Sequence, residues 1–590
     1  RMQNPYWIAY RNLRLNNKKR YMASAGLSYQ ILDWLNVAGR VRIDNTHSEY
    51  EGKLYASSSN TLTDGSTQGH YTVNNGQYSQ TYADVLVNIN KRIQDFTIVA
   101  NIGASYSGVT SKELGYAGPI RETGIPNLFN VYDLDNAKKR ATQVGWREAT
   151  ESVFASAEVG WKSMLYLTVT GRNDWASQLT HSPQASFFYP SVGLSAVITE
   201  MLKLPDWVDY LKVRGSFSSV GNPYPRFLTY PTYSYDANKQ DWKSQTNYPI
   251  GKLYPERTDS WEIGLDATLF KDFKLSGSFY YANTYNQTFD PRLPVSSGYD
   301  KLYVQTGYVR NYGFEAMLSY GHRWGDFSWD SSFTFSANKN EIVELVKDYV
   351  HPETGKTYNV DKLELKTDEG RGFGKAKFIL KEGGTLGDLY THADLKRDIN
   401  GNILIDDSGN VTAIDNAGDI KLGSVLPKAN LAWNNSFSYK GINAGFLLTA
   451  RLGGIVYSAT QAYLDLYGVS ETSAAARDAG GVWVNGRSRV NPQSFYEVVA
   501  SQSGLPTYYT YSATNLRLQE AHIGYTIPRR WLGNVCDINV SLVGRNLWMI
   551  YCKAPFDPEA VATTNNYYQG IDYFMMPSTR NIGFNIKINF

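Results

Sequence analysis

The chain has 590 residues, far more than one ordinary soluble core needs, so several domains or one large barrel are expected. Charged residues make up only 19% and the formal net charge is +3, which argues against the broad basic surface of a nucleic-acid-binding protein. Aromatic residues reach 14%, with 45 tyrosines and 50 glycines, a composition that suits strands and turns better than helices.

Alternation of apolar and polar residues with a period of two predicts strands throughout the chain. No apolar run of about 18 residues occurs, so no transmembrane helix is expected. The clearest alternating segments, in chain order, are 96–106, 165–175, 327–336, 538–545 and 582–590. In the last of these, apolar residues from Ile582 to Phe590 alternate with asparagine, glycine and lysine. Each strand therefore has one apolar and one polar face.

Short and long connections alternate along the chain. Short turns are expected at Lys271-Asp272, at Arg323–Asp326 and at Lys440-Gly441. Long loops are expected at roughly 45–80, 107–150, 218–258, 337–427 and 453–512. A soluble β-sandwich has no reason to segregate its loops by length, whereas outer-membrane barrels have short periplasmic turns and long extracellular loops. The predicted fold is therefore all-β, a transmembrane antiparallel β-barrel of the Gram-negative outer membrane, with about seventeen strands in this chain.

Side-chain parity gives each strand an orientation. In the strand that begins at Leu165, the apolar parity faces lipid, while Arg172 and Asp174 face the lumen, where they line a path or contact a plug. The same parity places Asp330 in the lumen; the alternative is that such residues only wet the inner wall. Aromatic residues at the two ends of the lipid-facing band are expected to form girdles, and the candidates are Trp175 and Trp548 at the outer level and Phe273 and Phe590 at the lower level.

Short motifs follow one another in a fixed order between about residue 150 and residue 590. They are Arg172-Asn173-Asp174-Trp175, 187–195 (FFYPSVGLS), 211–214 (LKVR), 220–222 (VGN), 255–258 (PERT), 261–266 (WEIGLD), 422–427 (LGSVLP), 516–518 (LRL), 523–528 (IGYTIP), 544–547 (GRNL), 556–559 (FDPE) and 577–580 (PSTR). As an ordered set they resemble the SusC/RagA-like family of TonB-dependent outer-membrane transporters. The first 150 residues resemble the family less distinctly.

The resemblance implies a 22-stranded barrel that contains an N-terminal plug, is opened by TonB through a short box before the plug, and is capped by a SusD-like surface lipoprotein. Residues 1–590 are expected to be the barrel portion of such a protein, without the plug, the TonB box and the first strands. The implied function is TonB-dependent import of a bulky nutrient, an oligosaccharide first and a peptide second. The alternative is a passive porin or a surface glycan-binding barrel without an energised gate. The identity of the nutrient is not predicted.

Aromatic residues in the long loops are candidates for ligand contact, because flat rings stack on sugars and their hydroxyl groups form hydrogen bonds. Packing between loops, or against a lipoprotein lid, explains them equally well. The candidates are Tyr230, Tyr233, Tyr235, Trp242, Tyr508, Tyr509, Tyr567 and Tyr568.

No cofactor, metal or catalytic residue is expected. The seven histidines are scattered, without the spacing of a zinc site, and no enzyme motif occurs. The acidic stretch 394–415 invites a calcium interpretation, but counting from Asp398 or from Asp406 places Ile403 or Val411 where an EF-hand loop needs glycine. Asn400-Gly401 instead predicts a hairpin turn.

Overall fold

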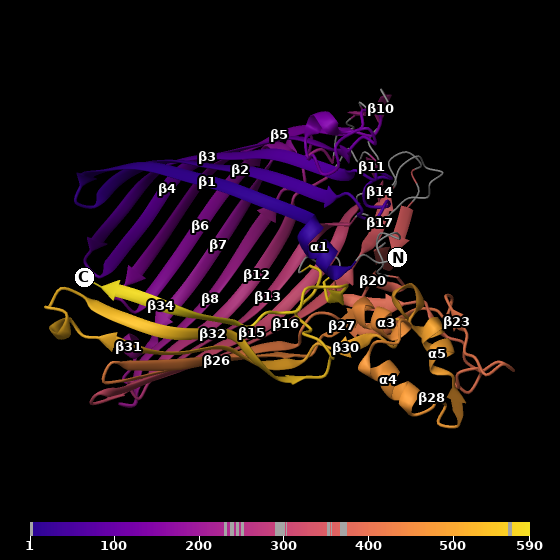
Figure 1. The fold of residues 1–590 in the computed structure, drawn as a ribbon. Helices are drawn as coiled ribbons and strands as arrows, with labels where there is room; N and C mark the ends of the chain where they lie inside the picture. The colour runs from indigo at the N-terminus through magenta and orange to yellow at the C-terminus, as the bar shows by residue number, and fades with distance from the viewer. Residues whose placement is uncertain are drawn as a thin grey trace. The chain divides into compact units, whose positions relative to one another are not determined.

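A computed structural model gives the fold and describes residues 4–228, 233–236, 241–243, 247–248, 253–289, 301–302, 304–350, 355, 357–365, 374–563 and 569–589. Strands dominate these residues, and 17 of the strands form one sheet (Figure 1). Every register resolved between strands of this sheet is antiparallel, for example between β3 and β4. The predicted all-β chain of about seventeen strands is confirmed. Within the described part of the chain, no helix is both long enough and apolar enough to cross a bilayer.

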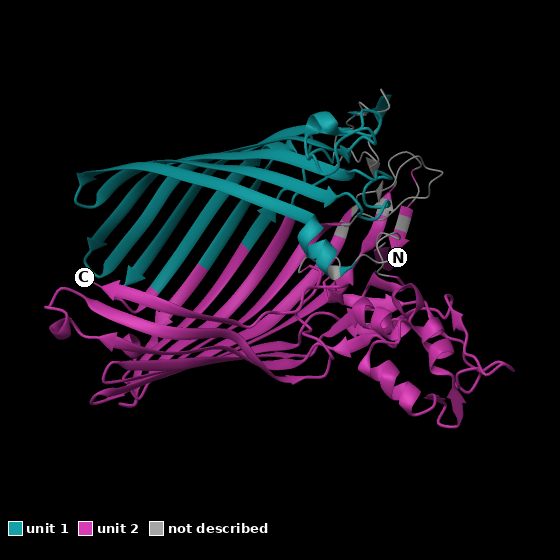
Figure 2. Ribbon diagram, in the orientation of Figure 1, with its two compact units in different colours: residues 1–162, 166–192, 219–255 teal, residues 163–165, 193–218, 256–590 magenta. Residues whose placement is uncertain are grey.

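The chain divides into two compact units, coloured separately in Figure 2. Unit 1 comprises residues 1–162, 166–192 and 219–255, and unit 2 comprises residues 163–165, 193–218 and 256–590. Three strands, β6 (Leu165–Ala176), β7 (Ser186–Val197) and β8 (Val208–Asn222), contribute residues to both units.

Unit 1 begins with the short helix α1 (Pro5–Arg11), whose first turn is capped by the Asn4 side chain. Long strands then follow in chain order, and β1 to β4 each pair with the next. Their bounds are β1 (Asn12–Leu32), β2 (Leu35–Tyr55), β3 (Gly69–Ile93), β4 (Phe96–Pro119), β5 (Arg140–Trp161) and β6 (Leu165–Ala176). The connections carry the short elements η1 (Val131–Asp133), η2 (Ser177–Leu179), β9 (Ser234–Asp236), β10 (Asp241–Lys243) and β11 (Asn247–Tyr248).

Unit 2 continues the same meander after the short helix α2 (Ile198–Met201). Its long strands are β12 (Glu256–Leu269), β13 (Phe273–Phe289), β15 (Val304–Trp324), β16 (Phe327–Glu344), β25 (Ala429–Tyr439), β26 (Ile442–Leu452), β31 (Asn515–Ile527), β32 (Asp537–Cys552) and β34 (Asn581–Asn589). The turn predicted at Lys440-Gly441 is confirmed, and both of its residues have positive φ, 46° and 90°. Because consecutive strands are antiparallel, alternate connections lie at opposite ends of the sheet.

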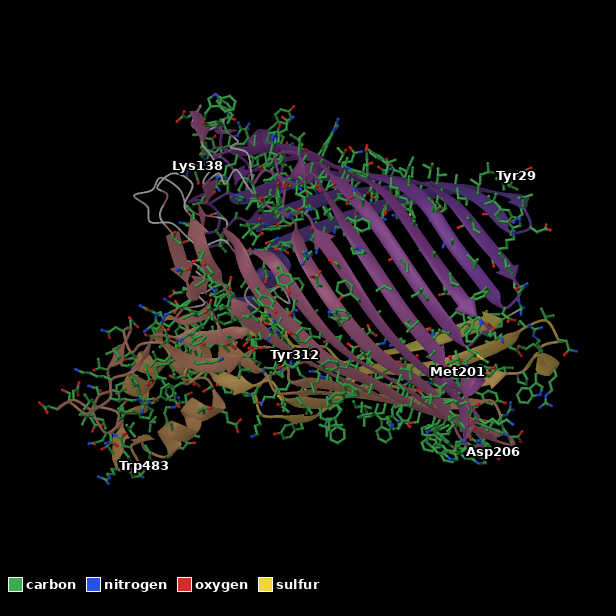
Figure 3. The ribbon with its side chains drawn as sticks, turned by 180° about the vertical axis from the view of Figure 1, so that it is seen from behind. Tyr29, Lys138, Met201, Asp206, Tyr312 and Trp483 are labelled. Carbon is green, nitrogen blue, oxygen red and sulfur yellow. The ribbon has the colours of Figure 1, made fainter. Side chains whose placement is uncertain are left out.

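Residues labelled in Figure 3 show where short and long connections lie at the two ends of the strands in each unit. Tyr29, beside the tight β1–β2 turn, and Lys138, in the long β4–β5 connection, lie at opposite ends of the unit 1 strands. In unit 2, Met201 and Asp206 lie at one end and Trp483 at the other. The predicted segregation of short and long connections is confirmed.

The predicted limits of several long loops are wrong, because the strands continue well into them. β2 and β3 stay paired as far as Tyr55 and Gly69, and β4 and β5 as far as Ala117 and Arg140. The prediction counted apolar residues at alternate positions, and both faces of these strand ends are rich in polar residues. Backbone pairing does not need an apolar face, so the hairpins extend past the region that alternation reveals.

Three connections of unit 2 fold together into a body that we call the loop body, made of the described residues of 345–428, 453–514 and 553–580. Its core includes Phe378, Leu389, Tyr457, Val499, Tyr509 and Ile571. β27 (Ile455–Ser458) joins the connections, because it pairs antiparallel with β30 (Thr510–Ser512) and parallel with β33 (Ile571–Asp572). Figure 1 shows its helices gathered at one end of the unit 2 strands.

The remaining elements of the loop region are short. The strands are β17 (Val346–Val350), β18 (Thr357–Val360), β19 (Lys362–Leu365), β20 (Ala376–Lys381), β21 (Asp388–Thr391), β22 (Asp394–Leu395), β23 (Ala413–Ile414), β24 (Ile420–Ser424), β28 (Val482–Val484) and β29 (Ser488–Val490), with β14 (Lys301–Leu302) in an earlier connection. The helices are α3 (Ala459–Leu466), α4 (Glu471–Asp478), α5 (Pro492–Val499) and η4 (Ser501–Ser503), and η5 (Arg529–Trp531) lies in the β31–β32 turn. The long connection predicted over 453–512 is present, but it contains helices and strands that were not predicted. Its helices had a local signal, because Ser458, Ser470 and Asn491 cap them and Pro492 follows a cap.

Candidate functional site

The sheet has a polar face and an apolar face, fixed by the strand registers. Residues directly opposite each other in neighbouring strands share a face, and the face changes at every residue. One row runs across five strands of unit 2 through Ser278, Glu315, Ser336, Asn430 and Arg451. The row displaced by one residue carries Gly277, Ala316, Phe335, Leu431 and Ala450. The polar face is the candidate functional surface.

A charged cluster on the polar face of unit 1 contains both predicted lumen residues of β6. Arg172 Nε donates to Asp174 Oδ1 over 2.7 Å, and Arg172 Nη2 donates to Ser152 Oγ over 2.7 Å. The Tyr189 hydroxyl donates to the other carboxylate oxygen of Asp174. Asp174 is buried beneath these donors, so the Arg-Asn-Asp-Trp motif contributes an ion pair that binds β5, β6 and β7 together.

Sequence reasoning missed two further ion pairs of unit 1, both between neighbouring strands. Arg20 Nε donates to Asp44 Oδ1 over 2.8 Å, and Arg40 Nε lies 3.1 Å from both carboxylate oxygens of Asp84. Both aspartates are buried while the arginines extend into solvent. Arginine and aspartate at polar-parity positions were the available signal, but pairing them requires the register.

In unit 2, Arg214 likewise forms ion pairs with carboxylates of the neighbouring strand. Its Nη1 donates to Asp266 Oδ2 over 2.8 Å and its Nη2 donates to Glu262 Oε1 over 3.2 Å. These residues come from the LKVR and WEIGLD motifs on β8 and β12. The motifs therefore meet on the polar face, where Arg214 is neutralised by two carboxylates.

A cavity of about 790 Å³ lies on the polar face of unit 2. Its floor consists of the row described above and of a second row two residues along, Ser276, Met317, Thr334, Ala432 and Thr449. Arg214 lies at one side of the cavity, and Gln519 and Glu559 lie at the other. Asp330, the third predicted lumen residue, lines a separate cavity of about 510 Å³ near the β12–β13 turn.

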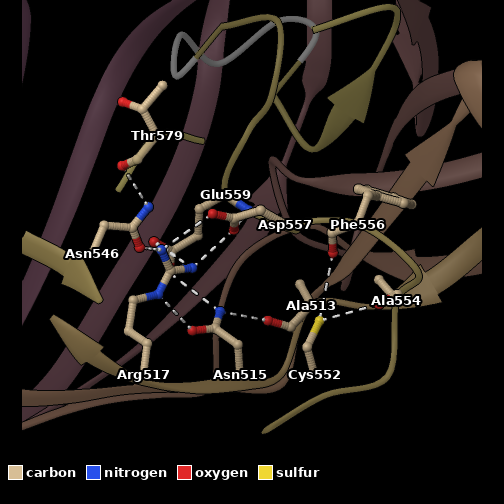
Figure 4. A network of polar contacts seen from close by, with 10 residues as sticks. All are labelled: Ala513, Asn515, Arg517, Asn546, Cys552, Ala554, Phe556, Asp557, Glu559 and Thr579. Atoms are coloured by element: carbon tan, nitrogen blue, oxygen red, sulfur yellow. Dashed lines mark hydrogen bonds and ion pairs between the residues drawn. The ribbon is translucent and has the colours of Figure 1, made fainter. Parts of the chain in front are cut away.

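A buried arginine gathers several motifs at the base of the loop body (Figure 4). Arg517 Nη2 donates to Asp557 Oδ1 over 2.9 Å and lies 3.2 Å from Glu559 Oε2. The Asn546 side chain accepts a bond from Arg517 and donates to the Thr579 carbonyl over 3.2 Å. The LRL, GRNL, FDPE and PSTR motifs, apart in the sequence, therefore form one network.

This network also lowers the pKa of the Asp557 carboxyl group. Burial raises the pKa of Asp557, but hydrogen bonds from Arg517 and from the backbone of Glu559 more than offset it, so the pKa lies below its ordinary value. Asp557 therefore stays ionised and holds the last connection of the sheet against β31.

The predicted ligand-contact aromatics lie in three different settings. Tyr233, Tyr235 and Trp242 are exposed, and Trp242 lies opposite Tyr235 in the β9–β10 hairpin with ring centroids 5.3 Å apart. Tyr509 is only 2% exposed within the loop-body core, and Tyr508 packs against that core. These last two contacts support the packing interpretation. Tyr230, Tyr567 and Tyr568 lie outside the described residues.

The acidic stretch forms two successive turns rather than a cluster of converging ligands. Asp398 Oδ1 accepts the backbone N–H groups of Asn400 and Asn402, both over 2.8 Å, and Arg397 bridges to Ile403. The hairpin turn predicted at Asn400-Gly401 is confirmed, and Asp406 repeats the arrangement. Within the described ranges, no three histidine, cysteine or acidic side chains are placed to hold a metal ion.

The family described as TonB dependent receptor-like, beta-barrel matches residues 2–547. The chain belongs to this family. It is 23% identical to TonB-dependent receptor P3 of Formosa agariphila over 625 residues, which cover 99% of this chain and 60% of that protein. It is 24% identical to TonB-dependent receptor SusC of Bacteroides thetaiotaomicron over 433 residues, 67% of this chain and 40% of that protein.

A solved structure of the RagAB peptide transporter superposes with a TM-score of 0.74 at 17% identity, covering 99% of this chain and 63% of that chain. At this identity the match shows the fold. The SusC/RagA-like resemblance is confirmed, and the chain spans about 60% of the length of the P3 receptor. The family is one of transporters and receptors rather than enzymes.

As a TonB-dependent receptor-like β-barrel, the protein is an outer-membrane protein, and the apolar face of its sheet is the lipid face. The predicted girdle residues Trp175, Trp548 and Phe273 are all exposed on this face. Phe273 belongs to a chain of ring contacts that runs from Trp207 through Phe270, Phe273, Tyr320, Trp329 and Phe437 to Phe446. Such a band is typical of a membrane interface. Phe590 lies outside the described residues.

Proposed function

We propose that this barrel imports a bulky nutrient, an oligosaccharide or a peptide, across the outer membrane with energy supplied through TonB. The observation that carries the proposal is the family match over residues 2–547 together with a polar inner face that holds a cavity of about 790 Å³. The similarity to the RagAB peptide transporter supports a nutrient as cargo.

We further propose that the gating plug and the TonB contact belong to the full-length protein outside residues 1–590. The proportion of the relatives that this chain spans supports this division. A SusD-like lipoprotein is the proposed partner, and the loop body is its proposed platform, because a folded body presents a more rigid surface than separate loops.

Growth of the native host tests the import proposal. Strains with the full-length gene deleted, or with TonB deleted, are compared on oligosaccharides and on peptides as sole carbon sources. The proposal expects both deletions to abolish growth on the same source. Growth that needs the barrel but not TonB would identify a passive porin, and growth unaffected by the barrel deletion on every source would overturn import altogether.

Loop aromatics are tested in the same strains. Trp242→Ala removes the most exposed ring of the β9–β10 hairpin and is expected to slow uptake of the cognate nutrient. Unchanged uptake and binding would remove Trp242 from the ligand site. Tyr132→Ala, an exposed ring outside both the β9–β10 hairpin and the loop body, is the matched control.

A further inference from the structure

The first of the two rows that form the floor of the unit 2 cavity carries charged residues of opposite sign, Glu315 and Arg451. Glu315, Ser336, Asn430 and Arg451 lie directly opposite one another on four successive strands, β15, β16, β25 and β26. All four line the cavity of about 790 Å³. Three strand intervals separate Glu315 from Arg451, which corresponds to about 14 Å at the usual spacing of about 4.8 Å.

Neither end of this row is neutralised by a neighbour of opposite charge in ion-pair contact. Arg451 donates from Nη2 to the Val425 carbonyl over 2.7 Å, but no described carboxylate lies within ion-pair distance of it. Glu315 likewise has no basic partner among the described side chains. Arg214, at the side of the same cavity, has two acidic partners. Glu559, which lines the same cavity, attracts Arg451 from beyond ion-pair distance. The cavity therefore presents one cation and one anion, neither of them in a direct ion pair, on strands three intervals apart.

We propose that this row binds a short peptide with free termini, its ammonium group at Glu315 and its carboxylate at Arg451. The proposal rests on the import function and names the cargo class. Four residues in extended conformation span about 13–14 Å, which matches the separation of the two charges. Ser336 and Asn430 lie between them and offer a hydroxyl group and an amide to the peptide backbone.

The same cavity suits a neutral sugar poorly. Among the described residues that line it, Phe335 is the one aromatic residue, and its side chain is on the apolar face. A sugar would therefore find no ring to stack on, whereas a zwitterion finds two charged groups.

The test is calorimetric binding to the full-length protein in detergent, with tetra-alanine as the probe. Its N-acetylated form, its C-terminal amide and di-alanine are measured beside it. Each modified tetrapeptide loses one charge-assisted hydrogen-bond pair, so we expect about tenfold weaker binding of each. Di-alanine cannot reach both ends and is expected to bind at least as weakly.

Variants assign each end of the peptide. Arg451→Gln is expected to remove the preference for the free carboxylate over the amide but to keep the preference for the free amine, and Glu315→Gln is expected to do the reverse. Arg451→Lys retains the charge and should retain the preference. Glu520→Gln and Arg545→Gln remove charges from the same face outside the cavity and should change neither ratio. Heat-modifiable migration in gels shows whether each variant is folded.

Equal affinity of the four probes, or ratios that Arg451→Gln and Glu315→Gln leave unchanged, would overturn the proposal. So would a failure of every peptide to bind to a protein that still supports TonB-dependent growth on another nutrient, and in that case import stands without this site. Loss of both peptide binding and TonB-dependent growth on all sources would instead reject the import function.

Discussion

The indole Nε1 of Trp329 donates a hydrogen bond to Asn435 Oδ1 over 3.0 Å on the lipid face of the sheet. Trp433 makes the equivalent bond to Ser331 Oγ, also over 3.0 Å, and Ser331 lies directly opposite Asn435. Asn435 is 1% exposed. On a face that contacts hydrocarbon, two polar oxygens, Asn435 Oδ1 and Ser331 Oγ, thus each accept a hydrogen bond from an indole, which matters because lipid offers no alternative partners.

Trp329→Phe removes the indole donor while keeping an aromatic ring. The expected loss is about 1–3 kcal/mol in the free energy of unfolding, because the Asn435 carbonyl is left without a donor. Equilibrium urea unfolding of protein refolded into vesicles measures it. Trp548→Phe is the control, since Trp548 is 60% exposed and its indole makes no hydrogen bond to a described residue. The double variant Trp329→Phe with Asn435→Leu should recover most of the loss; equal losses at Trp329 and Trp548 would contradict the assignment.

Arg517→Ala is expected to detach the connection 553–580 from β31. Removing one member of a buried ion pair leaves Asp557 charged and unpaired, which costs about 3–5 kcal/mol. The measurement is limited proteolysis, with cleavage in 553–580 expected to appear in the variant first. Arg545→Ala breaks only the exposed pair with Glu520 and is expected to cost less than about 1 kcal/mol. Identical cleavage patterns for the two variants would show that the buried network is dispensable.

Acid should weaken the loop body through Asp419. Hydrogen bonds from Lys362, over 2.7 and 2.6 Å, and a contact with His392 hold the pKa of Asp419 below its ordinary value of 3.8. A lowered folded-state pKa gives stability that is present above the unfolded pKa and is lost as the pH falls through the folded pKa. The melting temperature of the wild type should therefore fall more steeply below about pH 4 than that of Asp419→Asn. Parallel curves for the two proteins would rule out this contribution.

Tyr457→Phe tests a buried hydrogen bond within the 453–514 connection of the loop body. The Tyr457 hydroxyl donates to the Ser503 carbonyl over 2.6 Å in a fully buried position. The variant loses the donor of a buried hydrogen bond, and the expected cost is about 1–3 kcal/mol. Thermal unfolding followed by thermolysin cleavage measures it. Tyr467→Phe, on an exposed ring, should leave the cleavage temperature unchanged, and a similar shift in both variants would contradict the role of Tyr457.

Alternation made much of the sheet predictable. The turn at Lys440-Gly441, the strand that begins at Leu165 and the polar parity of Arg172 and Asp174 all follow from a period of two. The loop body could not be predicted from alternation, because its core unites Phe378, Tyr457 and Ile571 from three separate connections. No local pattern shows that such distant segments meet.

The same limit applies to the site. Arg451 and Glu315 each had a readable parity, but their alignment depends on the registers of three strand pairs. A one-residue slip in any register would turn one partner toward lipid. The motif residues Arg517 and Asp557 could be recognised as a set, yet only the folded chain shows that they touch.

The parallel pairing of β27 with β33 sets an order on assembly. Tyr457 and Ile571 are direct partners, and the intervening chain contains both β31 and β32. Closing contacts of such large sequence separation is slow, because the entropy of the long intervening segment must be lost first. We therefore expect the loop body to complete its core only after β31 and β32 have paired with each other. Until then its unfinished edge at β27 is open to other chains, which makes the last stage of biogenesis the period when this barrel most needs a chaperone.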